Sequence, residues 1–272
     1  MARPLIEDIK GGAMPVVTRA AGGLCLQLLP GVPYSARDPL QSQSMGVSLQ
    51  RQRGVHAIGS DRRVDFDTWP GVLACTPAGI DIFSESEHGG EYLVLRWRDA
   101  ALSDVPQDAR QQRRVEMAGH RQALALALRL RRLMLATQAD PLALEHAALA
   151  LLSLRQVYQE APRRVARANM ARVLERIACQ FDQGLTLQRL AADEGLPLLR
   201  FLRDFTRATG MTPHAYIVET RVQAARNMLL EVDRPLADIA YASGFAHQSH
   251  MGSAMRAALG LTPGQYRQLL VT

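Results

Sequence analysis

The feature that most constrains this 272-residue chain is a duplicated unit near its C-terminus. Residues 187–216 and 236–266 share a pattern of apolar, glycine and turn positions. Leu187, Leu190, Ala191, Gly195 and Leu196 recur as Leu236, Ile239, Ala240, Gly244 and Phe245. One residue is then inserted, and Phe201, Phe205, Gly210, Thr212, Pro213 and Tyr216 recur as Met251, Met255, Gly260, Thr262, Pro263 and Tyr266. This regularity indicates two copies of one supersecondary unit.

Each copy predicts a short helix, a tight turn and a second helix. Thr186 is a suitable N-cap for the first helix, and Gly195 supplies the positive φ that the turn requires. Phe201 and Phe205 lie four residues apart and therefore share one helix face. The pattern is that of a helix-turn-helix motif, whose second helix enters the major groove of DNA; the alternative is an ordinary helical hairpin.

Residues 214–230 carry apolar positions at helical spacing and predict one long helix between the two copies. Such a helix is about 25 Å long at 1.5 Å per residue. We expect it to hold the two second helices about 34 Å apart, the spacing of successive major grooves on one face of DNA.

Charge is distributed unevenly along the chain, whose formal net charge is +6. From Arg163 onward there are 14 basic and 9 acidic residues, so this part carries +5 of the total. Lys10 is the single lysine, and all other basic residues are arginines, which suit bidentate contacts with phosphates and guanines. The C-terminal part is therefore expected to meet a polyanion.

The residues that carry these features resemble the DNA-binding domain of the AraC/XylS family of bacterial transcription regulators. The matching positions, within residues 167–270, are Leu190-Ala191, Gly195-Leu196, Phe201, Phe205, Gly210 to Pro213, Arg221, Ala225-Arg226, Leu229-Leu230, Ile239-Ala240, Gly244-Phe245, Gln248-Ser249 and Gly260 to Arg267. The resemblance implies an all-α DNA-binding domain over residues 169–270, with helix-turn-helix motifs at 187–208 and 236–258. It also implies double-stranded DNA as the partner.

The resemblance further implies which side chains meet DNA. The base-facing positions are Leu199, Arg200, Leu202, Arg203, Gln248, Ser249, His250 and Ser253. Arginine pairs bidentately with guanine and glutamine with adenine, so Arg200, Arg203 and Gln248 suit direct readout. The leucines are expected to contact thymine methyl groups or to add little discrimination. The residues expected to hold phosphates are Arg207, Arg226, Arg256 and Arg267.

The N-terminal part predicts a different architecture. Residues 45–98 contain short alternating or β-branched runs separated by turn signals, which indicate an antiparallel β domain. Residues 120–137 and 141–159 then change to helical spacing, with an arginine-rich face at Arg129, Arg131 and Arg132. In the resembled family this region is a cupin-like barrel that binds an effector and forms dimers.

The expected fold class is thus α+β multidomain: a cupin-like antiparallel β-barrel with a dimerisation helix pair, followed by the all-α domain. The expected domains are an N-terminal segment, 1–40, that is partly disordered; a sensing β domain, 41–118; a helical dimerisation region, 119–160; and a linker, 161–168. The small-molecule effector and the residues that bind it are not predicted.

Catalysis and metal binding are not expected. The histidines of the N-terminal part, His56, His88, His120 and His146, are scattered and do not form a metal-ligand motif, so no cofactor is predicted. Three widely spaced cysteines indicate a reducing compartment, and no apolar run predicts a membrane span. We expect a protein of the bacterial cytoplasm that is associated with the nucleoid when bound to DNA.

The sequence therefore predicts a sequence-specific transcription regulator and not an enzyme. The resemblance to the AraC/XylS family favours a homodimeric activator that contacts RNA polymerase and responds to a small molecule. The alternatives are a ligand-independent DNA-binding repressor and an architectural DNA-binding protein. An enzyme with a passive helical appendage would need a cluster of titratable residues in the β domain, and the sequence offers none.

Overall fold

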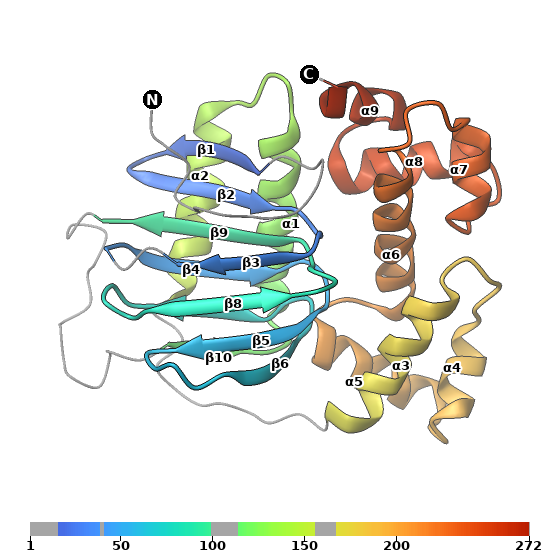
Figure 1. Ribbon diagram of the computed structural model, residues 1–272. Helices are drawn as coiled ribbons and strands as arrows, with labels where there is room; N and C mark the ends of the chain where they lie inside the picture. Colours follow the sequence, from blue (N-terminus) through green and yellow to red (C-terminus); the bar gives the residue numbers. More distant parts are fainter. Residues whose placement is uncertain (1–15, 39–40, 99–113, 156–166, 272) are drawn as a thin grey trace. The chain divides into compact units, whose positions relative to one another are not determined.

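The computed structural model describes residues 16–38, 41–98, 114–155 and 167–271 (Figure 1). The chain divides into two compact units, Met1–Pro162 and Arg163–Thr272. The expected linker, 161–168, and the first 15 residues lie largely or wholly outside the described residues.

The N-terminal unit contains two antiparallel sheets. Its strands are β1 (Val17–Ala21), β2 (Leu24–Leu29), β3 (Tyr34–Arg37), β4 (Gln43–Ser48), β5 (Gln52–Ile58), β6 (Val64–Thr68), β7 (Leu73–Thr76), β8 (Ile82–Ser86), β9 (Tyr92–Trp97) and β10 (Val115–Met117). One sheet has the order β1-β2-β9-β4-β7-β10 and the other β3-β8-β5-β6. Among the described residues no strand of one sheet pairs with a strand of the other, so the expected barrel is not closed. The α+β class is confirmed.

The larger sheet is covered on one face by helices α1 (Arg121–Leu135) and α2 (Pro141–Ser153), as Figure 1 shows. Side chains alternate between the two faces of a strand, and Leu26, Met45, Val47, Leu93 and Leu95 are all fully buried at 0% exposure. Leu26 pairs with Leu95 and Val47 with Leu93, so these residues share one face. This shared face forms the core with α1 and α2.

Residues 17–37 differ from the expectation of a partly disordered segment before the β domain. They form β1, β2 and β3, and β2 pairs with the central strand β9. The β domain therefore begins well before residue 41. The prediction of partial disorder fails here because the glycines and prolines of this stretch lie in the turns between strands and not within them.

The helix pair follows the predicted spacing, and Asp140 caps α2 by accepting a hydrogen bond from the Leu142 amide at 3.0 Å. The sequence predicts that Arg131 lies on an arginine-rich face of α1. This prediction is wrong for Arg131, because its side chain is only 1% exposed. Arg131 Nη1 donates to Glu91 Oε2 at 2.8 Å, and the Glu91 side chain is 0% exposed. A carboxylate 40 residues earlier in the chain thus holds this arginine inside.

The C-terminal unit is helical in its described residues, as expected. Its helices are α3 (Arg167–Gln180), α4 (Leu187–Asp193), α5 (Leu198–Thr209), α6 (Pro213–Met228), α7 (Leu236–Ala242), α8 (Gln248–Leu259) and α9 (Pro263–Val271). The long helix α6 contacts both α5 and α8. Figure 1 shows α6 as the element that joins the α4–α5 pair to the α7–α8 pair.

Both predicted turns have the required geometry. Thr186 caps α4 by accepting from the Arg189 amide at 3.2 Å, and Gly195 and Gly244 have φ values of 64° and 79°. A Cβ on Gly244 would lie 2.6 Å from the Cα of Asp182, so this turn also needs glycine for close approach to the end of α3. The two motifs are therefore packed into one domain.

Candidate nucleic-acid interface

Helix α5 has one buried face and one exposed face. Phe201 and Phe205 are fully buried, with ring centroids 5.9 Å apart, and Phe205 meets Tyr216 of α6 edge-on at 5.5 Å. The opposite face carries Leu199, which is 73% exposed, together with Arg203 and other arginines. Because the aromatic residues fix the rotation of α5, the predicted base-facing residues lie on the solvent side.

Electrostatics distinguish the three arginines of α5. Arg200 and Arg207 lie 3.6 Å and 3.9 Å from the carboxylate of Asp204, one turn away on the same helix. Arg203 has no carboxylate partner among the described residues, and its Nε donates to the Leu199 carbonyl at 3.3 Å. Within α5, Asp204 therefore partly neutralises the charges of Arg200 and Arg207 but not that of Arg203. Leu202, the remaining predicted residue, is half-buried.

Helix α8 repeats this arrangement with different chemistry. Met251, Met255 and Leu259 are fully buried. The predicted base-facing residues on the other side are exposed: Gln248, Ser249, His250 and Ser253. Arg256, a predicted phosphate contact, is also exposed and lies in the last turn of the helix. The structure therefore brings the predicted residues of this helix to one surface.

His247 has a role that the sequence did not predict. It is the N-cap of α8: its Nδ1 accepts from the His250 amide at 3.1 Å and lies 2.8 Å from the Ser249 hydroxyl. The His250 ring packs edge-on against Phe245 with centroids 5.2 Å apart. These contacts order the first turn of α8, where a recognition helix meets the bases. A Ser, Thr, Asp or Asn cap would have been easier to recognise in the sequence.

Two of the four predicted phosphate contacts are engaged within the protein. Arg226 is 3% exposed, donates to the Tyr266 hydroxyl at 3.0 Å and to Gln223 Oε1 at 2.8 Å, and stacks on the Tyr266 ring. The prediction for Arg226 is wrong, because the packing of α6 against α9 removes its side chain from the surface. Arg267 is half-buried and donates to the Arg234 carbonyl at 2.6 Å, which ties α9 to the loop before α7.

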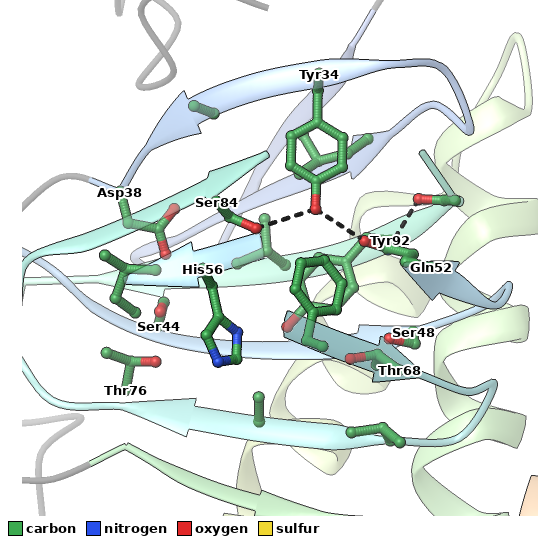
Figure 2. A pocket seen from close by; sticks show the side chains of 18 of the residues that line it. Tyr34, Asp38, Ser44, Ser48, Gln52, His56, Thr68, Thr76, Ser84 and Tyr92 are labelled. Carbon is green, nitrogen blue, oxygen red and sulfur yellow. Dashed lines mark hydrogen bonds between the residues drawn. The ribbon is translucent and has the colours of Figure 1, made fainter. Parts of the chain in front are cut away.

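The N-terminal unit contains a feature that no motif predicted. A cavity of about 120 Å³ lies between the two sheets and is lined by side chains from both, several of which Figure 2 labels. Within the described ranges, no group of three His, Cys, Asp or Glu side chains is placed to hold a metal ion. In the same ranges no helix is long and apolar enough to cross a membrane.

Comparisons with known proteins match the C-terminal unit. A family profile described as a helix-turn-helix domain matches residues 190–269. The chain is 36% identical over 87 residues to the transcriptional activator NphR of a Rhodococcus species, covering 32% of this chain and 26% of that protein. It is 28% identical over 105 residues to the probable transcriptional regulator LumQ of Photobacterium leiognathi, covering 39% and 42%.

A third relative matches over a slightly longer stretch of the chain. The chain is 30% identical over 120 residues to the HTH-type transcriptional activator RhaS of Klebsiella pneumoniae, covering 44% of this chain and 42% of that protein. The chain thus spans less than half the length of these curated relatives. The predicted helix-turn-helix domain is confirmed.

Proposed function

We propose that this chain, whose C-terminal domain is an AraC/XylS-type helix-turn-helix domain, is a sequence-specific regulator of transcription that binds double-stranded DNA through α5 and α8. One observation carries the proposal. Two helices in related motifs each bury an apolar face and expose a face with arginine or glutamine, the side chains that read guanine and adenine.

The proposed roles follow exposure and charge. Arg203 is the principal base contact on α5, because its guanidinium has no carboxylate partner among the described residues, and Gln248 is its counterpart on α8. Arg207 and Arg256, in the last turns of their helices, hold phosphates. The remaining proposed base contacts are Leu199, Arg200, Leu202, Ser249, His250 and Ser253.

The helix pair of the N-terminal unit supports a proposed homodimer. Leu142 of α2 is 74% exposed and Leu149, two turns later on the same face, is 38% exposed. Exposed leucines in this arrangement are typical of a helix-packing surface. The proposed partners are therefore a second copy of the chain, DNA, a small-molecule effector in the β domain and, for an activator, RNA polymerase.

The test is selection of binding sites from a random pool of DNA duplexes by the full chain, followed by affinity measurements at fixed salt. The selected duplex should bind at least about 10³-fold more tightly than random DNA. Arg203→Ala should weaken binding by about 1 to 3 kcal/mol and relax the preference at one base pair. The matched variant Arg207→Ala should weaken all duplexes alike and reduce the salt dependence.

An affinity for the selected duplex that does not exceed the affinity for random DNA would contradict the proposal. Equal losses for Arg203→Ala on every sequence would assign that residue to phosphate binding instead. A ligand-independent repressor or architectural protein would still bind DNA, but its affinity would not respond to any small molecule that occupies the β domain.

A further inference from the structure

The cavity of the N-terminal unit is built by strand alternation. Ser44 and Ser48 of β4 face it, and so do Tyr92, Val94 and Arg96 of β9, each two residues apart. Gly46 lies between the two serines, and a Cβ there would collide with the hydroxyl end of Tyr92. The glycine therefore makes room for the Tyr92 ring to lie along β4 beneath the cavity.

The charges of the described lining residues cancel. Arg96 Nη2 donates to Asp38 at 2.8 Å, and Arg114 Nε donates to Glu116 at 2.9 Å. Burial lowers the pKa of His56 below its ordinary value of 6.5, so the imidazole is neutral at pH 7. An anionic guest would have to displace a carboxylate from an arginine, and a cationic guest would have to displace an arginine from a carboxylate. Both displacements are costly inside a protein.

Polar groups without charge remain available for a guest. The Ser48 side chain is 0% exposed and its Oγ has no hydrogen-bond partner among the described residues. Burial raises the pKa of Tyr92 to about 12, so its hydroxyl is a neutral donor. The Tyr34 hydroxyl lies 3.1 Å from both Gln52 Oε1 and Ser84 Oγ on the opposite side of the cavity (Figure 2). An unpaired buried hydroxyl is unfavourable, and a guest that hydrogen-bonds to it would remove that cost.

The remaining wall is largely apolar and includes two stacked rings. The rings of His56 and Phe66 are stacked at 5.2 Å between centroids with an interplanar angle of 11°. Both rings line the cavity, together with aliphatic side chains such as Ile58, Ile82 and Val94. Parallel ring planes favour a planar guest, because offset stacking adds to the apolar area that is buried.

We propose that this cavity binds a neutral, planar-ring small molecule carrying a hydroxyl or amide group, which hydrogen-bonds to Ser48 and Tyr92. The proposal rests on the proposed function in that such a molecule would be the effector. The chemistry of the lining nevertheless defines the ligand class without reference to DNA.

The test uses three probes with the same ring and different charge: para-hydroxybenzyl alcohol, para-hydroxybenzoate and para-hydroxybenzylamine. Ligand-detected NMR with the full chain at pH 7.5 gives each Kd, which is expected in the millimolar range for so small a molecule. The neutral alcohol should bind at least about 10-fold more tightly than either ion. At about five times its Kd it should raise the Tm of the β domain by about 2 to 4 °C.

Variants locate the site. Ser48→Ala and Tyr92→Phe should each weaken binding of the alcohol by about 2- to 12-fold, the worth of one hydrogen bond. Ser48→Ala should not lower the Tm of the free protein, because it removes an unpaired buried hydroxyl. Ser35→Ala is the matched control, since Ser35 lies between two cavity-lining residues of β3 and faces away from the cavity. Ser35→Ala should change neither the Kd of the alcohol nor the Tm of the free protein.

Equal or tighter binding of either ion, or no binding of any probe at millimolar concentration, would overturn the proposed ligand class. Affinity for the selected duplex is measured on the same protein without probe. Lost DNA binding with the probe preference intact would contradict only the regulator proposal. Intact DNA binding with no preference for the neutral probe would contradict only the ligand class.

Discussion

Replacing Arg131 with methionine is expected to destabilise the N-terminal domain by about 3 to 5 kcal/mol. The Arg131 and Glu91 side chains are 1% and 0% exposed, and their charged atoms are 2.8 Å apart. Methionine nearly fills the same space but removes the guanidinium that lies beside the buried Glu91 carboxylate. Removing one partner of a buried ion pair costs more than the pair contributes, so the loss should far exceed that of a surface substitution.

The assay is urea unfolding followed by tryptophan fluorescence. The chain has two tryptophans, Trp69 and Trp97, and both are 5% exposed within the β domain, so the signal reports this unit alone. The matched control is Arg129→Met, an exposed arginine on the same helix, which should change stability by no more than about 0.5 kcal/mol.

A double-mutant cycle isolates the pair. Glu91→Leu combined with Arg131→Met removes both charges and should recover most of the loss seen with Arg131→Met alone, because apolar replacement of a buried pair is often neutral or stabilising. If Arg131→Met costs less than about 1 kcal/mol, or if the two changes are additive within about 0.5 kcal/mol, the buried pair does not have the role we assign to it.

Three further predictions concern caps, turns and association. Burial lowers the pKa of His120, whose Nδ1 accepts the Ala123 amide at 2.9 Å, so its contribution is present above pH 6.5 and is lost as pH falls through the folded-state pKa. His120→Asn should retain the cap without this pH dependence in urea unfolding, whereas His120→Ala should lose about 1 kcal/mol. Gly260→Ala should cost about 1 to 2 kcal/mol by circular dichroism, from its φ of 77° alone, and Gly244→Ala should cost more because its Cβ would also collide with backbone. Leu142→Glu should shift the full chain from dimer to monomer in sedimentation equilibrium without lowering its Tm; an unchanged mass would exclude α2 from the interface.

The helix-turn-helix domain could be predicted from sequence because its determinants are local. A cap, a turn glycine and apolar residues at helical spacing lie within some 20 consecutive residues, and the chain repeats them. Arg226 and Arg131 could not be placed this way. Each occupies a helical position where an arginine is ordinarily solvated, and each is buried by a partner 40 residues away, Tyr266 and Glu91 respectively.

The residues that line the cavity could not be named from the sequence for a related reason. Its lining comes from nine strands, β2 to β10, and no contiguous motif marks it. One signal is present in the sequence: Ser44, Gly46 and Ser48 alternate with the apolar Met45 and Val47. Small and polar residues along one face of a buried strand indicate that the face meets a cavity or a close neighbour. The strands β1 to β3 were missed because glycine and proline suggested irregular structure.

Hydroxyl-radical footprinting of the full chain on its selected duplex shows directly how many grooves one protomer occupies. We predict two protected tracts per protomer, centred about 10 base pairs apart on one face of the DNA. Arg203→Ala should weaken the protection of one tract, and Gln248→Ala should weaken the protection of the other. A single protected tract, or one that both variants weaken alike, would contradict the reading of two major grooves by α5 and α8.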